Sequence, residues 1–311
     1  MTFDAEHRAA TEGALIHPRT DLAVFAVTGK DRLSWLNGLV TQDVGKLASG
    51  AGAYSLAVGK TGRIMAELWI VGGADRVYVV VARDRLEMIR QHFDKHLIME
   101  DAEIGDALDR DVLFLHGPLA RDLVGDARTF GADAAMVDWT GRGDAAVVLA
   151  PEGKRTELED ALFARAGRAG ATATDEAWES IRIAWGLPRF GVDFDEQSLP
   201  QEAALERVAV SFSKGCYLGQ ETVFMLEKRG HARRRLARIA VEGADAVAAG
   251  AEIALADDGA VGTVTSATPG GEGTLALGYV KFKHASVGTA LVIAGRPARI
   301  IGLAADPVAK A

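Results

Sequence analysis

The sequence is poor in cysteine, in long apolar runs and in positive charge. Cys216 is the only cysteine among 311 residues, so no intramolecular disulfide can form and nothing requires an oxidising compartment. No apolar run approaches the ~20 residues that a membrane-spanning helix needs, and residues 1–10 contain no apolar signal core. The net charge of −8 disfavours a protein that coats nucleic acid, although a local basic site remains open. These absences predict a soluble, cytoplasmic protein without a membrane span.

The composition that is present is that of an ordinary globular protein. Hydrophobic residues make up 49% of the chain and charged residues 25%, and the length suits about two domains. Residues 54–58 and 63–71 alternate in a way that predicts a hairpin with a glycine-containing turn. Helix patterns occur at residues 31–40, 84–97 and 175–185. Hairpins mixed with helices, without steady β–α–β alternation, predict an α+β fold.

The pattern of residues along the sequence changes at about residue 236. Short β-rich runs separated by glycine-rich turns follow, and no helix signal appears; the runs are 236–241, 261–266, 275–280 and 290–293. This pattern predicts a small all-β barrel or sandwich at the C-terminal end.

The surroundings of Cys216 favour a functional thiol. The residue lies between Gly215 and Gly219, with Lys214 and Tyr217 beside it. Because glycine permits sharp turns, we expect the thiol to lie on a tight, exposed turn. The alternative is a small buried hydrophobe, as many lone cysteines are. The glycines and charged neighbours favour the first interpretation.

A short helix is predicted directly after this turn. Residues 220–229 have an acidic first turn and a basic last turn, and Gly230 suits a left-handed cap beyond them. A thiol just ahead of a helix N-terminus and next to Lys214 is favoured as the thiolate.

Residues 214–221 read Lys-Gly-Cys-Tyr-Leu-Gly-Gln-Glu, which resembles the Lys-Gly-Cys-Tyr-x-Gly-Gln-Glu signature of the YgfZ-type folate-binding proteins. Those proteins belong to the larger family of glycine-cleavage T-proteins, the aminomethyltransferases. Residues 191–203 resemble the family's Gly-x-Asp…Pro-x-Glu-Ala segment, and residues 29–54 resemble its N-terminal folate domain. The resemblance implies a GcvT-like folate-binding region over 1–230, in two α+β subdomains split near 105–115, followed by a β-barrel domain over 231–311.

The resemblance also implies a binding site for tetrahydrofolate or a derivative, with weakened transferase chemistry. In T-proteins the hairpin strand carries Gly-Gly-Ile-x-Asp-Asp, which includes the catalytic aspartate. This chain has Ala66 and Glu67 at the two acidic positions, and Ala184 where T-proteins have glutamate. The folate scaffold is therefore kept, while aminomethyl transfer is in doubt.

Glu67 is a binding candidate on its residue pattern as well. Its strand-mates on the same face are Met65 and Trp69, so a carboxylate lies among apolar and aromatic side chains. A pterin ring has a flat face to stack and an aminopyrimidine edge that suits a carboxylate. The alternative is a solvent-facing strand with incidental apolar residues.

Further candidates come from the family segments and from a basic run. Glu196 and Glu202 flank Pro200 in a segment whose family counterpart faces the central cavity, although either could be an ordinary loop carboxylate. The basic run consists of Lys228, Arg229, Arg233, Arg234, Arg235 and Arg238. It could bind the anionic folate tail, hold RNA phosphates, or simply be a solvated face.

Together these observations predict a tetrahydrofolate-binding accessory protein. By resemblance it supports maturation or repair of iron–sulfur enzymes, including enzymes of tRNA modification. The alternatives are a folate-dependent aminomethyltransferase or demethylase, and an RNA-binding module. Whether the chain catalyses any reaction is left open.

One cysteine cannot hold a cluster of the four-cysteine kind, so iron–sulfur clients would be partners. His92 and His96 have helix spacing but no evident third ligand, so no metal site is predicted. The candidate catalytic residue is Cys216, and the candidate folate contacts are Tyr54, Glu67, Trp69, Glu196, Glu202, Lys214, Tyr217, Gln220, Glu221 and Arg229.

Overall fold

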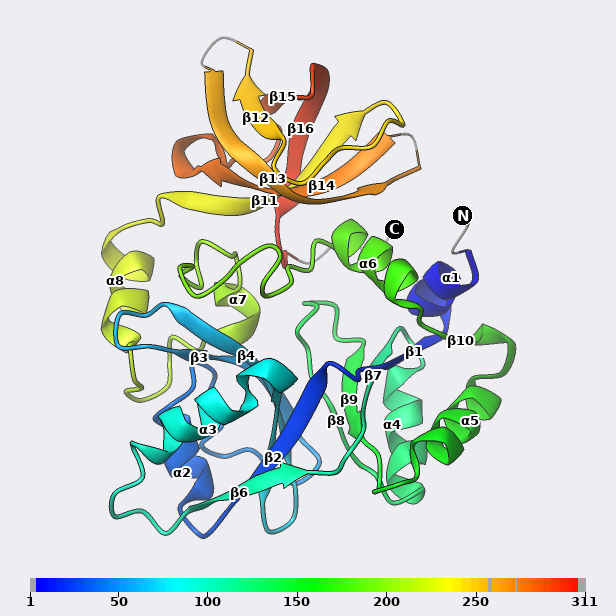
Figure 1. Ribbon diagram of the computed structural model, residues 1–311, viewed down its shortest axis with the longest axis vertical. Helices are drawn as coiled ribbons and strands as arrows, with labels where there is room; N and C mark the ends of the chain where they lie inside the picture. Colours follow the sequence, from blue (N-terminus) through cyan, green and yellow to red (C-terminus); the bar gives the residue numbers. More distant parts are fainter. Residues whose placement is uncertain (1–3, 257–258, 272, 307–311) are drawn as a thin grey trace. The chain divides into compact units, whose positions relative to one another are not determined.

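The computed structural model describes residues 4–256, 259–271 and 273–306, with the side chain of Arg229 excepted (Figure 1). Internal contacts divide the chain into two units. Unit 1 comprises residues 1–58, 65–177 and 213–218, and unit 2 comprises residues 59–64, 178–212 and 219–311.

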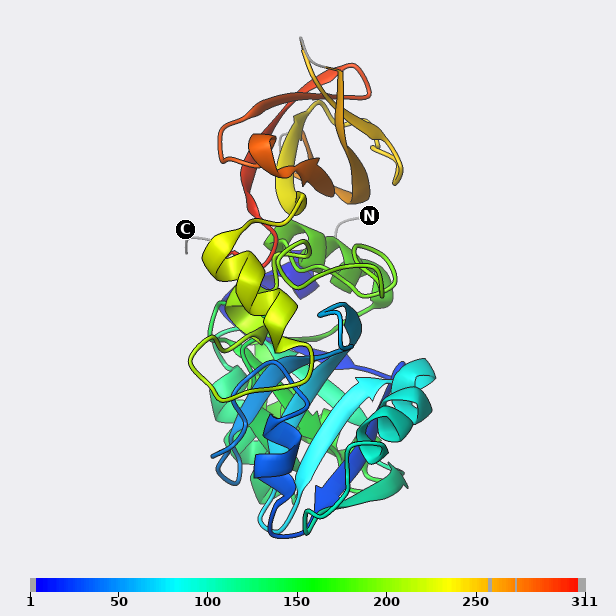
Figure 2. The ribbon, with the colours of Figure 1, turned by 90° about the vertical axis from the view of Figure 1, so that its left-hand side faces the viewer.

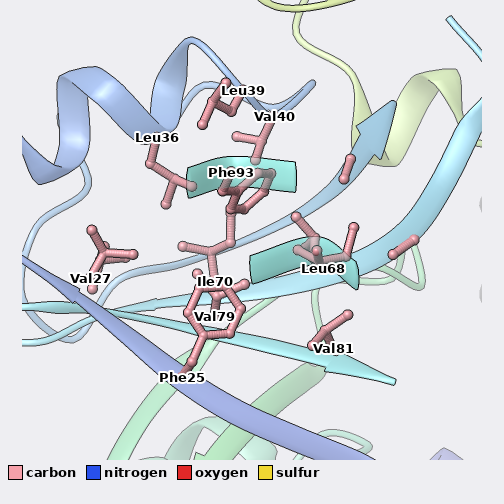
Figure 3. Packing of buried hydrophobic residues seen from close by; sticks show 14 of the residues in the cluster. Phe25, Val27, Leu36, Leu39, Val40, Leu68, Ile70, Val79, Val81 and Phe93 are labelled. Carbon is pink, nitrogen blue, oxygen red and sulfur yellow. The ribbon is translucent and has the colours of Figure 1, made fainter. Parts of the chain in front are cut away.

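The first sheet of unit 1 has five strands in the order β3-β4-β5-β2-β6. Its strands are β2 (Leu22–Thr28), β3 (Gly52–Val58), β4 (Ile64–Gly72), β5 (Val77–Ala82) and β6 (Glu103–Leu108). Helices α2 (Arg32–Asn37) and α3 (Leu86–Asp94), the latter preceded by the 3₁₀ turn Arg83–Arg85, cover one face. Figure 3 shows Leu36 of α2 and Phe93 of α3 packed with Leu68 and Ile70 of β4 in one buried cluster.

The alternation of side chains along β4 decides what the other face carries. Ala66, Leu68 and Ile70 all belong to this buried cluster. Since successive residues of a strand point to opposite faces, Glu67 and Trp69 lie on the face turned away from the two helices.

The second sheet of unit 1 also has five strands, in the order β10-β1-β7-β9-β8. Its strands are β1 (Ala14–Pro18), β7 (Val112–His116), β8 (Asp133–Met136), β9 (Ala145–Leu149) and β10 (Gly170–Thr172). Helices α4 (Ala120–Thr129) and α5 (Arg155–Ala166) bury Leu123 and Leu158 with Leu113 and Leu115 of β7. Helix α1 (Asp4–Glu12) and the 3₁₀ turn Gly167–Ala169 complete this part.

Unit 2 contains a closed barrel of six strands, in the order β11-β14-β13-β12-β15-β16. The strands are β11 (Arg234–Glu242), β12 (Glu252–Leu255), β13 (Gly259–Pro269), β14 (Gly273–Lys281), β15 (Ala290–Ile293) and β16 (Arg296–Leu303). Strand β11 pairs with both β14 and β16, which closes the barrel, and Figures 1 and 2 show it from perpendicular directions. The remaining elements are α6 (Asp175–Trp185), α7 (Glu206–Ala209), α8 (Gln220–Arg229) and the 3₁₀ turn Phe282–His284.

The predicted α+β fold with a C-terminal all-β barrel is confirmed. The helices predicted over residues 175–185 and 220–229 coincide with α6 and α8. The predicted left-handed cap at Gly230 is wrong, because its φ and ψ of −149° and −162° are extended. The left-handed glycine is Gly219, with φ of +78°, at the start of the helix instead of its end. Within the described ranges, no helix combines the length and apolar character needed to cross a bilayer.

Candidate functional site

Tyr54, Glu67 and Trp69 meet on the face of the first sheet that is turned away from α2 and α3. The phenol of Tyr54 donates a 2.6 Å hydrogen bond to Oε1 of Glu67, and its ring centroid lies 5.6 Å from that of Trp69. Tyr54 and Trp69 are buried, whereas Glu67 is half-buried. Three of the residues predicted to contact folate are therefore brought together by adjacent strands β3 and β4.

The electrostatics of this group keep the phenol protonated. Burial raises the pKa of Tyr54 well above its ordinary value, and the neighbouring Glu67 charge raises it further. A neutral phenol donates and a carboxylate accepts at several lone-pair positions. The bond from Tyr54 thus orients Glu67 while using one of these positions.

Aromatic residues of strand β7 and of the connection between β8 and β9 extend this group, and sequence reasoning missed them. Trp69 lies 5.1 Å from Phe114 and 6.1 Å from Trp139, while His116 lies 5.5 Å from Trp139, all between ring centroids. We call Tyr54, Trp69, Phe114, His116 and Trp139 the aromatic wall. The alternation of side chains along β7 could have predicted that Phe114 and His116 share one face. No local sequence pattern, however, indicates that this face lies against β4.

Two buried histidines lie side by side at the aromatic wall. The rings of His17 and His116 are 5.9 Å apart, and Arg19 stacks its guanidinium 4.7 Å from the centroid of Phe114. Burial, followed by the charge of Arg19, lowers the pKa of His116 to about 3. Burial, Arg19 and His116 lower the pKa of His17 well below its ordinary value. Both imidazoles are therefore neutral at physiological pH.

Cys216 is exposed, as its glycine neighbours predicted. Lys214, in contrast, is buried, and its ammonium is engaged with the backbone. Its ammonium donates to the carbonyl oxygens of Asn37 at 2.6 Å, Val40 at 2.8 Å and Gln42 at 2.9 Å. Because an ammonium has three N–H groups, these bonds use them all. That the positive charge of Lys214 favours a thiolate at Cys216 stays a prediction.

Tyr217, the other neighbour of Cys216, is buried as well. Its ring centroid lies 5.1 Å from Nζ of Lys214, and burial raises its pKa to about 12. The two residues flanking the exposed Gly215 and Cys216 are thus turned into unit 1, which leaves the thiol at the tip of the turn.

The other predicted folate contacts belong to unit 2. Glu202 lies 3.6 Å from Nη2 of Arg234, Glu196 and Glu221 are exposed, and Gln220 begins α8. Arg229 lies in α8, and its side chain is outside the described part. Their roles stay predictions.

Three arginines of the predicted basic run, Arg234, Arg235 and Arg238, are engaged within unit 2. The guanidinium of Arg234 stacks 3.9 Å from the ring centroid of Tyr279, and Arg235 pairs with Glu206. Arg238 donates a 3.1 Å hydrogen bond to the carbonyl of Ala184. A side chain at Gly186 would collide with Arg238, since its Cβ would lie 2.1 Å from Cδ. These arginines stabilise the fold, which leaves less of the run for a polyanion.

No group of three or more histidine, cysteine, aspartate or glutamate side chains suited to a metal ion occurs within the described part of the chain. The rings of His92 and His96 are 5.2 Å apart, but Nδ1 of His96 lies 2.9 Å from the carbonyl of His92, so this pair is engaged with its own helix.

Comparison with known proteins identifies the fold. The aminomethyltransferase T of the glycine cleavage system from Bartonella henselae superposes with a TM-score of 0.81 at 20% identity, covering 97% of this chain and 88% of that one. Residues 1–148 match the GCVT N-terminal domain, and residues 233–303 match the CAF17 C-terminal beta-barrel domain. The class is therefore that of GcvT-like proteins.

Relatives found by sequence include both aminomethyltransferases and a YgfZ protein. An aminomethyltransferase from Rubrobacter xylanophilus is 27% identical over 85% of this chain and 74% of that protein. The tRNA-modifying protein YgfZ from Yersinia enterocolitica is 24% identical over 70% of this chain and 68% of that protein. The chain therefore combines a GCVT N-terminal domain with a CAF17-type barrel domain in a GcvT-like fold, and it is similar to YgfZ and to aminomethyltransferases.

Proposed function

We propose that this chain binds a reduced folate, tetrahydrofolate or a derivative, with its pterin at Glu67 and the aromatic wall. We further propose that it acts as a cytoplasmic accessory protein in the maturation or repair of iron–sulfur enzymes and in the tRNA modification that depends on them. The observation that carries the binding proposal is the Tyr54–Glu67 hydrogen bond of 2.6 Å beside the indole of Trp69.

The chemistry of the group suits a pterin better than a purely apolar ligand. A flat heteroaromatic ring stacks or packs edge-on against aromatic side chains, and its aminopyrimidine edge presents donors to a carboxylate. Glu67 is held by Tyr54 in one orientation, so the ligand would not have to order it. The neutral imidazoles of His17 and His116 add polar atoms without adding charge.

An accessory role is favoured over aminomethyl transfer by what occupies the family's acidic positions. Ala66 is 1% exposed and packs in the hydrophobic cluster of the first sheet. Ala184 offers its backbone carbonyl to Arg238, and its side chain carries no acid. The relatives named aminomethyltransferase support the alternative function, a folate-dependent aminomethyltransferase or demethylase. For that alternative, Glu67 is the carboxylate that remains at the family's acidic positions, and positions 66 and 184 carry none.

The iron–sulfur and tRNA parts of the proposal rest on the likeness to the tRNA-modifying protein YgfZ and on the exposed thiol. Cys216 is the one group in this segment that can form a covalent bond readily at neutral pH. We propose that it reacts with a partner or a partner-bound species. Client enzymes would supply the cluster.

Calorimetric titration of the purified protein with tetrahydrofolate, folinate and a short RNA tests the proposal directly. Saturable binding of the reduced folates, with weaker or no RNA binding, is the expected result. Binding of RNA alone would overturn the folate proposal and favour the RNA-binding alternative. Binding of folate together with methylene transfer would favour the transferase alternative.

A further inference from the structure

The two ends of the turn that carries Cys216 are attached to one short stretch of unit 1. Residues 213–218, here called the Cys216 loop, belong to unit 1, whereas the residues before and after them belong to unit 2. Lys214 binds the carbonyls of residues 37–42, here called the carbonyl loop. The amide of Leu218 donates a 2.9 Å hydrogen bond to the carbonyl of Gly38 in the same loop. Cys216 is thus two residues from each attachment.

The carbonyl loop is itself held in place by strand β3. The amide of Leu56 donates a 2.9 Å hydrogen bond to the hydroxyl of Thr41, and the amide of Thr41 donates a 3.1 Å hydrogen bond to the carbonyl of Leu56. The amide of Gln42 donates a 2.9 Å hydrogen bond to the hydroxyl of Ser55. These bonds hold the acceptor carbonyls of Val40 and Gln42 in place, and Asn37 contributes the carbonyl of the last residue of α2. We call the three carbonyls together the socket.

The occupant of this socket is a tethered monovalent cation. Three carbonyl oxygens surround one buried ammonium at 2.6 to 2.9 Å, and no carboxylate pairs with it among the described residues. The negative charge of Asp43 acts on the ammonium, and the centroid of the Tyr217 ring lies 5.1 Å from Nζ. Carbonyl dipoles satisfy a cation without neutralising it, which is how proteins hold ammonium-sized ions.

We propose that Lys214 is the positioning residue of Cys216: its ammonium fastens the Cys216 loop to the carbonyl loop and thereby sets the orientation of the exposed thiol. The socket that it fills is a monovalent-cation site, which binds free ammonium or potassium once the lysine side chain is removed. The proposal rests on the proposed function only in treating Cys216 as the reacting group.

Protonation links this attachment to pH. Burial lowers the pKa of Lys214 to about 8, against a smaller opposing effect of Asp43. A neutral amine has two N–H donors and a lone pair, so at least one of the three carbonyl bonds is lost when the proton leaves. We therefore expect the Cys216 loop to be held near neutral pH and to loosen above about pH 8.

A nitroxide attached to Cys216 tests the proposal, because the only cysteine of the chain gives a single labelling site without any substitution. Its mobility is read by electron paramagnetic resonance. In the wild type the label should be restricted at about pH 7 and roughly twofold more mobile at about pH 9.5. In Lys214→Met, which keeps the length and removes the charge, it should be mobile at both values.

Added cations separate the socket from the covalent link that Lys214 provides. In Lys214→Ala, ammonium or potassium should raise the melting temperature by filling the socket, whereas tetramethylammonium, which is too large for it, should not. The label should stay mobile with all three ions, because a free ion does not join residue 214 to the carbonyl loop. A wild-type label that is equally mobile at both pH values, or a restricted label in Lys214→Met, would overturn the proposal. So would a Lys214→Ala variant whose melting temperature ammonium and potassium both leave unchanged.

The wild-type titration keeps the test informative if the variants fold poorly, since it uses the unaltered chain. None of these measurements involves folate. A failure to bind folate would therefore leave the result on Lys214 unaffected, and the two proposals can fail independently.

Discussion

The phenol of Tyr54 and the carboxylate of Glu67, which lie on adjacent strands, are joined by a hydrogen bond of 2.6 Å. Because of this hydrogen bond, the Glu67 carboxylate is an oriented acceptor near the indole of Trp69, where the sequence alone also allowed a solvent-facing side chain. The acceptor is therefore in place before any ligand arrives.

Removal of the Glu67 carboxylate should weaken the binding of reduced folate. Glu67→Ala is expected to cost ~1–3 kcal/mol of binding free energy, or roughly 5- to 150-fold in Kd, because a buried polar edge of the pterin loses its partner. Tyr54→Phe should have a smaller effect in the same direction, since it frees Glu67 without removing it. Calorimetry and quenching of tryptophan emission would measure both. Glu152→Ala, at an exposed position of unit 1, is the matched control. Unchanged affinity in Glu67→Ala would move the site elsewhere.

Aminomethyl transfer should be absent. Purified protein supplied with a lipoyl-bound aminomethyl donor and tetrahydrofolate is expected to form no methylene product above the protein-free background, because Ala66 and Ala184 carry no carboxylate. An authentic aminomethyltransferase assayed with the same reagents shows that the donor is competent. Turnover well above background would promote the transferase alternative.

Cys216 should be accessible and should contribute little to the fold. Its exposed thiol is expected to be alkylated by iodoacetamide in the native protein. Cys216→Ser should melt within a few degrees of the wild type, because truncation of an exposed side chain leaves no cavity of the kind that costs ~1 kcal/mol or more. Folate affinity should survive, whereas complementation of an iron–sulfur maturation defect should fail. A native thiol that resists alkylation, together with full complementation by the serine variant, would make the residue structural.

The buried His116 should make the protein sensitive to acid. Its pKa is about 3 in the folded chain, whereas an unfolded histidine titrates near 6.5, so the unfolded state binds the extra proton between these values. Stability is therefore fully present above about pH 6.5 and falls by ~1.4 kcal/mol per pH unit as the pH decreases towards 3. Urea unfolding of the wild type and of His116→Gln at several pH values would isolate this contribution. The two stability curves should converge as the pH falls, and parallel curves would contradict the prediction.

The buried ion pair of unit 2 should be required for its stability. Arg182 and Asp193 are 2% and 0% exposed, with 2.6 Å between Nη1 and Oδ2, and Arg182 also bonds to Ser266 of the barrel. Asp193→Ala is expected to lower the unfolding free energy by ~1–3 kcal/mol. Arg182, Thr265 and Ser266 each lose a buried hydrogen-bond partner, while Glu179 still pairs with the guanidinium. The control Lys154→Ala breaks an exposed pair and should barely change stability. A similar loss in both variants would contradict the argument.

Local patterns in the sequence were sufficient for the features that depend on near neighbours. The amphipathic pattern predicted α6 over its full range, and the charges at the two ends of residues 220–229 predicted α8. Alternation along residues 63–71 placed Glu67 and Trp69 on one face. The glycines beside Cys216 predicted an exposed thiol. Backbone preferences and side-chain period act over a few residues, so each of these could be derived without the rest of the chain. Gly230 shows the limit, because its backbone continues as extended chain instead of forming the cap that its residue type allows.

Contacts between distant segments were decided by the tertiary structure alone. The carbonyl partners of Lys214 are 172 to 177 residues away, and no periodicity links a lysine to backbone oxygens that every residue possesses. Phe114 and Trp139 join Trp69 only because the two sheets of unit 1 bring them together. The choice of a barrel over a sandwich required β11 to pair on both edges, which strand patterns do not encode. Sequence by itself thus determined which groups are present and which face each one takes, whereas the partners of Lys214 and Trp69 depended on how the chain brings remote backbone and side chains within bonding distance.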